Sequence, residues 1–166
     1  MNSSGKLRKR QRKKKMLKSY KRLTSSEIFR KWKLKHKDSF MCSFIIMNEK
    51  IQFDFYNKND TMTSFNVDGK ISMDENQKIF KKGDLNELKL GDINLTKEKA
   101  LEIIDKKYPD EKFNRRIIIL QNPEKPFWNI TLITSSLKLL NAKIDMKGNI
   151  ISETFEPLTN FMKQAK

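Results

Sequence analysis

The feature that most constrains the fold of this chain is a helical pattern that occurs twice, 72 residues apart. The two stretches are "LTSSEIFRKWKLKHKD" from Leu23 and "LTKEKALEIIDKKYPD" from Leu95. Each has a threonine where a helix N-cap is expected, and Glu27 follows Thr24 at the spacing of a capping box. Both stretches therefore predict a helix that begins directly after its threonine.

The apolar residues of the two stretches coincide when one is laid over the other. At the 72-residue offset, Phe29 falls on Leu101 and Trp32 falls on Ile104. Recurrence every three or four residues is the spacing of one helix face. Each helix is therefore expected to bury one apolar stripe against another layer of the fold.

Runs with the character of β-strands follow each helical stretch. Alternation of apolar and polar residues, typical of a strand with one buried face, is clearest in "IQFDFY" from Ile51 and "FWNITLI" from Phe127. Each series ends in a predicted hairpin turn with a glycine, Asp68-Gly69 or Lys147-Gly148. A tight hairpin needs a residue of positive φ, and glycine supplies it. The other strand-like runs are "SFIIMN", "TSFNV", "RRIIIL" and "LKLLNAKID".

This order predicts an α+β protein made of two tandem small units, each a helix packed on an antiparallel β-meander. The units span residues 23–82 and 95–157, with a linker at 83–94. A basic arm, flexible or helical, precedes them at 1–22, and a tail follows at 158–166. An internal duplication explains the recurrence most economically. The alternative is that any two segments of an amphipathic helix and a hairpin look alike.

The second unit resembles the PepSY family from Leu95 to about Pro157. The likeness is carried by "LTKEKALEI", then "FWNITLI", then the closing "KIDMKGNIIS". The first unit is similar more loosely, through "LTSSEIFRKW" and "NVDGKIS". The resemblance implies a cystatin-like unit with a helix on an antiparallel sheet, which acts as a binding or inhibitory module. It implies no catalytic residues.

PepSY domains occur in propeptides of thermolysin-like proteases and in cell-envelope proteins, and this chain departs from that setting. A secretory signal needs an apolar stretch of about 7–15 residues, and after "KLRKRQRKKK" only Met16 and Leu17 are apolar together. The longest apolar run, Phe44 to Met47, is far shorter than the roughly 20 residues of a membrane span. We expect a cytoplasmic protein, or a nuclear one in a eukaryotic cell, without a transmembrane segment.

The charge of the chain is concentrated near its N-terminus. Residues 1–37 contain 16 Lys and Arg but one acid, whereas the remainder contains 20 basic and 19 acidic residues. A basic segment without acids repels itself, so the arm is expected to be poorly ordered and to bind a polyanion, either nucleic acid or an anionic membrane. A solubilising tail without a partner is the plainer alternative. The candidate polyanion-binding residues are Lys6, Arg8, Lys9, Arg10, Arg12, Lys13, Lys14, Lys15, Lys18, Lys21 and Arg22.

Few residues are suited to catalysis. His36 and Cys42, the only histidine and the only cysteine, are the one available base and thiol, and more often such residues are structural. Glu98, Glu102 and Asp105 share one face of the second helix and could hold a cation, but a solvated face balanced by lysines is the commoner arrangement. The five glycines form no phosphate-binding loop. No enzyme activity, cofactor or metal is expected.

Two functions remain open from the sequence. The first is a non-enzymatic binding or regulatory protein of tandem PepSY-like units with a polyanion-binding arm. Such sheets could also capture a peptide by strand addition at an open edge. The second is a nucleic-acid- or ribosome-associated protein in which the arm carries the function and the body is a scaffold. Trp32 and Trp128 stand at periodic apolar positions, which favours core packing over base stacking.

Overall fold

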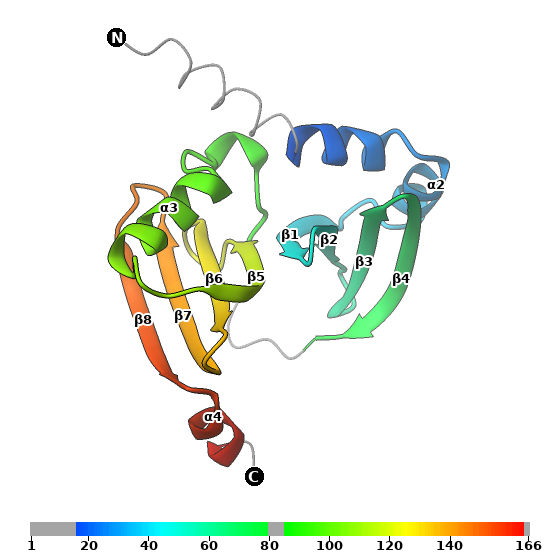
Figure 1. Ribbon diagram of the computed structural model, residues 1–166. Coiled ribbons are helices and arrows are strands. Elements are labelled where there is room, and N and C mark those ends of the chain that lie inside the picture. Colours follow the sequence, from blue (N-terminus) through cyan, green and yellow to red (C-terminus); the bar gives the residue numbers. More distant parts are fainter. Residues whose placement is uncertain (1–15, 80–84, 165–166) are drawn as a thin grey trace, which may run out of the picture.

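The computed structural model describes residues 16–79 and 85–164 and is an α+β fold built on one antiparallel sheet. The sheet has eight strands in the order β4-β3-β2-β1-β5-β6-β7-β8, and Figure 1 shows it as two four-strand parts that meet in the middle. The α+β class predicted from the sequence is confirmed. The strands are β1 (Phe40–Met47), β2 (Lys50–Tyr56), β3 (Thr61–Asp68), β4 (Lys70–Lys78), β5 (Phe113–Gln121), β6 (Phe127–Thr134), β7 (Lys138–Asp145) and β8 (Ile150–Pro157).

Helices and one irregular segment cover one face of this sheet. Residues 16–24 are helical and are followed at once by α2, while α3 lies in front of β5–β8 in Figure 1. Residues 85–96 run between these helices and attach to the sheet, where the indole Nε1 of Trp128 donates to the carbonyl of Leu95 at 2.9 Å. Besides helix 16–24, the helices of the described residues are α2 (Glu27–Lys35), the 3-10 helix η1 (Leu90–Asp92), α3 (Lys97–Lys107) and, after β8, α4 (Leu158–Gln164).

The strands follow the alternation of the sequence. Six predicted runs coincide with β1, β2, β3, β5, β6 and β7 to within one residue at the ends that extend beyond a strand, and the two glycine turns lead into β4 and β8. Gly69 has a φ of 56° and Gly148 a φ of 92°, so the expected positive-φ positions are confirmed. A side chain is strained in this region of φ, and glycine avoids that cost because it lacks a Cβ atom.

The centre of the sheet is a seam between β1 and β5. These strands pair antiparallel from Ser43 opposite Gln121 to Met47 opposite Ile117. Buried side chains from both four-strand parts belong to one hydrophobic cluster, which includes Phe44 of β1 and Leu120 of β5. The two parts are therefore joined by backbone hydrogen bonds and by a shared core.

The first helical stretch begins at a different residue from the one predicted. The N-cap of α2 is Ser26, whose side chain accepts a hydrogen bond from the Phe29 amide at 3.3 Å, so the predicted capping box starting at Thr24 is wrong. Thr24 instead ends the preceding helix, and its hydroxyl donates to the carbonyl of Lys21. In the second stretch the N-cap is Thr96, as predicted.

The buried helix faces agree with the predicted stripes in part. Phe29 and Trp32 of α2 pack with their ring centroids 5.1–5.3 Å from those of Phe55 and Phe65. In α3 the buried residues are Ala100 and Ile104, whereas Leu101 is half-buried. The match of Trp32 with Ile104 is confirmed. The match of Phe29 with Leu101 is looser. The first buried residue of α2, Phe29, stands three positions after the N-cap Ser26, whereas the first buried residue of α3, Ala100, stands four positions after the N-cap Thr96.

Residues 85–94, which lie in the predicted linker, pack against the body of the protein. Leu88 is 2 % exposed, and its amide donates to the carbonyl of Met41 in β1 at 2.7 Å. Asn86 binds the carbonyl of Asn122 in the turn between β5 and β6, and Ile93 is buried. This segment therefore contributes to the core over the seam.

Candidate functional site

The helical residues 16–24 are attached to the core by one apolar face. Met16, Tyr20 and Leu23 recur at intervals of four and three residues, which places them on the same side of a helix. Leu23 is fully buried, and the ring of Tyr20 lies edge-on to Phe53 with 5.6 Å between centroids. Burial, and to a smaller degree the negative charge of Glu87, raises the pKa of the Tyr20 phenol.

This packing corrects one expectation about the basic arm. Residues 16–22 are helical, so the prediction of poor order is wrong for this part, because the arm does contain periodic apolar anchors. The spacing of Met16, Tyr20 and Leu23 was the signal that could have revealed them. The remaining candidate residues lie outside the described residues, and they are Lys6, Arg8, Lys9, Arg10, Arg12, Lys13, Lys14 and Lys15.

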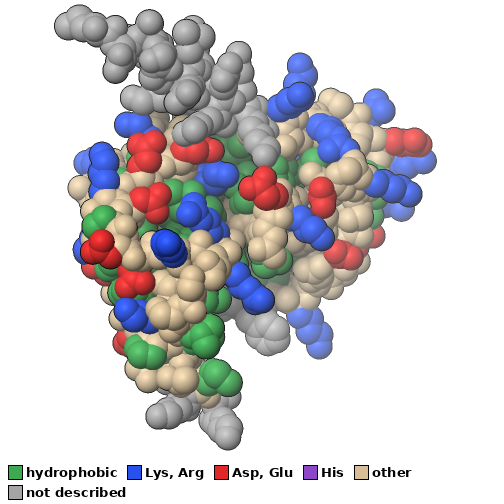
Figure 2. All heavy atoms as spheres, in the orientation of Figure 1, with side chains coloured by type: hydrophobic (Ala, Val, Ile, Leu, Met, Phe, Trp, Pro, Cys, Tyr) green, Lys and Arg blue, Asp and Glu red, His purple; other side chains and the backbone are tan. Residues whose placement is uncertain are grey.

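The outward sides of helix 16–24 and α2 present a dense group of cations. Residues 16–37 contain eight Lys and Arg and one acid, Glu27. Figure 2 shows Lys and Arg side chains gathered at the upper right, where these helices lie in Figure 1. We refer to the exposed cations of this segment as the basic surface, which consists of Lys18, Lys21, Arg22, Arg30, Lys31, Lys35 and Lys37.

Two local contacts hold parts of the basic surface in place. The Arg22 guanidinium donates to the carbonyl of Gly69 in the turn between β3 and β4. Lys31 lies 2.7 Å from the carboxylate of Glu27 one helical turn away, and this partner lowers the pKa of Glu27. The one acid of the segment is thus already paired with Lys31, and the charge of Arg30 acts on it more weakly.

Lys33 differs from its neighbours because its side chain caps the C-terminal end of α2. Its ammonium donates to the carbonyls of Lys37 and Ser39 just beyond the C-terminus of α2. Cations suit this end of a helix because the unpaired carbonyls there carry partial negative charge. Lys33 is therefore not counted in the basic surface.

Two leucines stand exposed among these cations. Leu34 in α2 is 71 % exposed, and Leu17 in helix 16–24 is 40 % exposed. Neither belongs to the hydrophobic core cluster, although both lie on helices whose other faces are buried in it. The surface is thus mixed in character, with cations around exposed aliphatic side chains.

A small cavity of about 50 Å³ lies beside Met16 of helix 16–24. Most of its lining is apolar, and the polar or charged contributors are Glu49, Thr96, Lys97 and Glu98. The apolar contributors come from helix 16–24, from both four-strand parts of the sheet and from the segment over the seam, and they are Met16, Phe44, Ile46, Ile51, Ile93 and Trp128.

The candidate base and thiol have other roles in the fold. The His36 ring stacks on Trp32 with 5.0 Å between centroids, and its Nδ1 lies 3.0 Å from the carbonyl oxygen of Trp32. Cys42 is buried, with its thiol donating to the carbonyl of Asp54 at 3.5 Å. Burial, followed by the charge of Asp54, raises the pKa of Cys42 to about 12. Because the thiolate is the nucleophilic form, this position does not activate the sulfur.

The acidic residues of α3 are arranged as a solvated face. Glu98 lies 3.7 Å from the ammonium of Lys97, and Glu102 and Asp105 are exposed. Within residues 16–79 and 85–164, no three His, Cys, Asp or Glu side chains form a group that could hold a metal ion.

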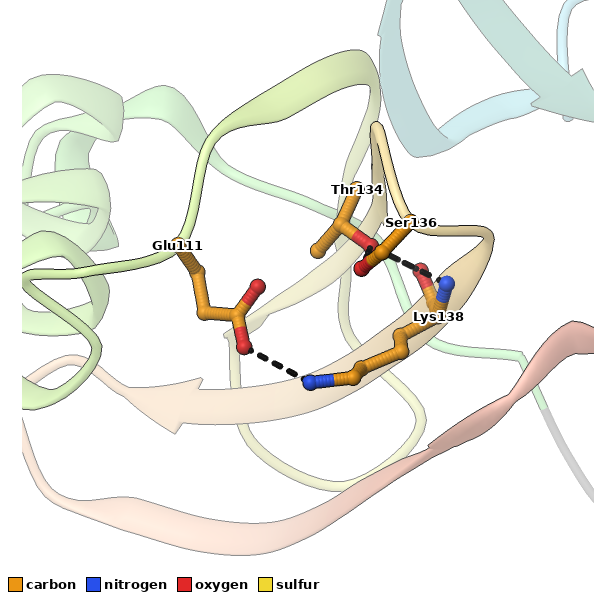
Figure 3. Close-up of polar contacts among 4 residues, drawn as sticks. All are labelled: Glu111, Thr134, Ser136 and Lys138. Atoms are coloured by element: carbon orange, nitrogen blue, oxygen red, sulfur yellow. Dashed lines mark hydrogen bonds and ion pairs between the residues drawn. The ribbon is translucent and has the colours of Figure 1, made fainter.

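A polar cluster at the turn between β6 and β7 is structural (Figure 3). The amide of Lys138 donates to the hydroxyl of Thr134 at 3.0 Å, and that hydroxyl lies 3.0 Å from the hydroxyl of Ser136. The ammonium of Lys138 reaches Glu111 in the connection after α3, also at 3.0 Å. These contacts tie the turn to the loop that leads into β5.

A buried carboxylate was missed by sequence reasoning. Asp54 alternates with Phe53 and Phe55 in β2, so it points to the sheet face opposite the helices, yet it is 2 % exposed. Its carboxylate accepts hydrogen bonds from Ser43, Gln52 and Ser64, each at 2.7 Å. A cross-strand set of this kind depends on register and on the irregularity between Met41 and Ser43, which no local pattern reveals.

None of the helices within the described residues has the length and apolar character needed to cross a membrane. The feature of these residues with the clearest chemical meaning is the basic surface with its two exposed leucines. Comparisons of the chain with protein-family models, with curated proteins and with solved structures found no match.

Proposed function

We propose that this protein is a non-enzymatic binding protein that holds a polyanion on its basic surface. The observation that carries the proposal is the packing of helix 16–24, because Tyr20 and Leu23 fix one face in the core and leave Lys18, Lys21 and Arg22 in solvent. Cations held on a folded scaffold lose less conformational freedom on binding than cations on a free chain. The scaffold thus favours binding of an anionic surface over a purely solubilising role.

Charge supplies the binding energy in this proposal. A polyanion releases condensed counterions when Lys and Arg neutralise its charges, and this release favours association at low salt. Eight further Lys and Arg precede Met16 in the sequence, at positions 6–15, and would add to the same interaction. The remainder of the chain is nearly neutral, so recognition is assigned to the N-terminal end of the protein.

We further propose that the scaffold consists of two PepSY-like units in tandem. The order of elements supports this reading, because α2 is followed by β1–β4 and α3 by β5–β8. A glycine of positive φ also stands between the last two strands of each series. In this proposal the protein works in the cytoplasm, or in the nucleus of a eukaryotic cell, and the edge strands β4 and β8 are open to a peptide partner.

Charge reversal on the basic surface tests the function. The variant carries Lys18→Glu, Lys21→Glu and Arg30→Glu, because none of these three side chains has the local contacts of Arg22 or Lys31. A short DNA duplex serves as a generic polyanion, and binding is measured over a range of salt. If all three cations contact phosphates, the slope of log K against log salt should become shallower by about 3.

The matched control reverses three exposed lysines elsewhere, with Lys99→Glu, Lys106→Glu and Lys125→Glu. Both variants have the same net charge, so an equal loss of binding in both would assign the effect to net charge and contradict the proposal. Absence of binding by the unmodified chain at low salt would contradict it as well.

A further inference from the structure

We infer that the polyanion held by the basic surface is the face of an anionic lipid bilayer, into which Leu34 and Leu17 insert. This inference rests on the proposed function, because it names the partner of the same surface. The positive charge of the basic surface favours an anionic partner. The exposed leucines favour a partner with an apolar interior that can bury them.

Leu34 stands at the centre of the cations of α2. Arg30 and Lys31 precede it by four and three residues and therefore lie on the same side of the helix, and Lys35 is adjacent. The opposite side of α2 is fixed by the burial of Phe29 and Trp32, so Leu34 cannot turn inward without unpacking the helix. Its exposure of 71 % is therefore a fixed property of this surface.

Leu17 lies at the border of the buried face of helix 16–24. It stands three residues before Tyr20, which packs on the core, and four residues before the exposed Lys21, and it is 40 % exposed. Each of the two basic helices thus presents one leucine together with its cations.

This combination suits a membrane surface better than a nucleic acid. Phosphate contacts need only cations, and an exposed aliphatic side chain adds nothing to them. At a bilayer interface the leucine enters the acyl boundary, while Lys and Arg extend their ammonium and guanidinium groups to the anionic headgroups. Aromatic side chains that could stack on bases are instead engaged in the core, since Phe29 and Trp32 are buried and Tyr20 packs on Phe53.

The experiment measures binding of the full chain to vesicles of phosphatidylcholine mixed with phosphatidylserine, to vesicles of phosphatidylcholine alone, and to a DNA duplex. Leu34→Ser should lower the affinity for the anionic vesicles by about 5-fold, because one aliphatic side chain no longer leaves water. Its affinity for DNA should stay unchanged, because the cations are unchanged, and an unchanged circular dichroism spectrum shows that the variant is folded. Leu34→Trp should bind the anionic vesicles at least as tightly as the unmodified chain, since Trp favours the membrane interface.

Ile151→Ser is the matched control, because Ile151 is 56 % exposed on β8, away from the basic helices. It should bind the anionic vesicles like the unmodified chain. Equal vesicle affinities of Leu34→Ser and the unmodified chain, or binding to DNA without binding to anionic vesicles, would overturn the bilayer inference and leave the proposed function standing. If the variant with Lys18→Glu, Lys21→Glu and Arg30→Glu bound both partners undiminished, the proposed function itself would fail.

Discussion

Cys42 is held as a neutral thiol by its position in β1. Its side chain is buried beside the backbone of Asp54, and desolvation followed by the charge of that carboxylate raises the pKa of the thiol to about 12. In an unfolded chain a cysteine ionises near pH 8.5. Between these two values the unfolded state releases a proton that the folded state keeps.

The free energy of unfolding should therefore fall as the pH rises above about 8.5, and this loss should be absent when the thiol is removed. Urea unfolding of the unmodified chain and of Cys42→Ala at about pH 8 and about pH 10 provides the measurement, and the unmodified chain should lose about 1–2 kcal/mol more than the variant. The two proteins differ only at residue 42, so the difference reports on Cys42. Parallel pH dependence would mean that the thiol ionises in the folded protein.

Single residues differ in how well their roles could be read from the sequence. The N-cap at Thr96 was predictable because a threonine stands just before a clean helical stripe. The N-cap at Ser26 was not, because Thr24, Ser25 and Ser26 are all competent caps and tertiary packing of the preceding helix decides among them. The burial of Asp54 was also not predictable from the sequence. Its three hydrogen-bond donors, Ser43, Gln52 and Ser64, come from three strands, and only the register of the folded sheet brings them to the carboxylate.

At the scale of elements, helix 16–24 depends on few side chains for its attachment. Leu23→Ala should destabilise the protein by about 2–4 kcal/mol, because the side chain is fully buried and its loss leaves a cavity. Leu17→Ala, at an exposed position of the same helix, should change stability by less than about 0.5 kcal/mol. Urea unfolding of the two variants provides the comparison, and similar losses in both would show that the helix does not dock through Leu23.

The strands were more predictable than this helix. Alternation in "IQFDFY" and "FWNITLI" revealed strands with one buried face, and both lie in the interior of the sheet, as β2 and β6. In residues 16–24 the many lysines masked an equally regular pattern of Met16, Tyr20 and Leu23. The cations of the candidate site were evident from the sequence, but their fixed arrangement depends on this packing and was not.

At the scale of the whole molecule, one sheet and one core predict one unfolding transition. Trp32 packs with Phe55 and Phe65 in the first four-strand part, and Trp128 is buried in the second. Trp32→Phe leaves a reporter in the second part, and Trp128→Phe leaves one in the first. For each variant, the denaturation midpoint from its remaining tryptophan should coincide with the midpoint from circular dichroism.

The two parts could also be stable to different degrees. In that case the fluorescence and circular dichroism transitions of one variant would separate, and the seam would be a weak contact between independent units. The two probes, fluorescence and circular dichroism, are compared within one variant at a time. A difference in stability between Trp32→Phe and Trp128→Phe therefore cannot be mistaken for separate transitions.

Each meander was predictable because its strands are neighbours in the sequence. The joining of the two meanders was not, because alternation within a strand does not say which edge of a sheet meets another. β1 carries "FIIM" and β5 carries "RRIIIL", and both are apolar enough to lie in the middle of a sheet. Their pairing with each other is a property of the assembled fold.

The seam also has a consequence for the order of folding events. Among the seven strand pairings of the described residues, six join strands that follow one another in the chain. The seventh, β1 with β5, brings together Ser43 and Gln121, 78 residues apart. Local hairpins close within microseconds, whereas a distant contact first costs the entropy of a long loop. Each meander is therefore expected to form before the seam, and the apolar strand β1 is expected to keep an unpaired edge in a newly made chain until β5 has left the ribosome.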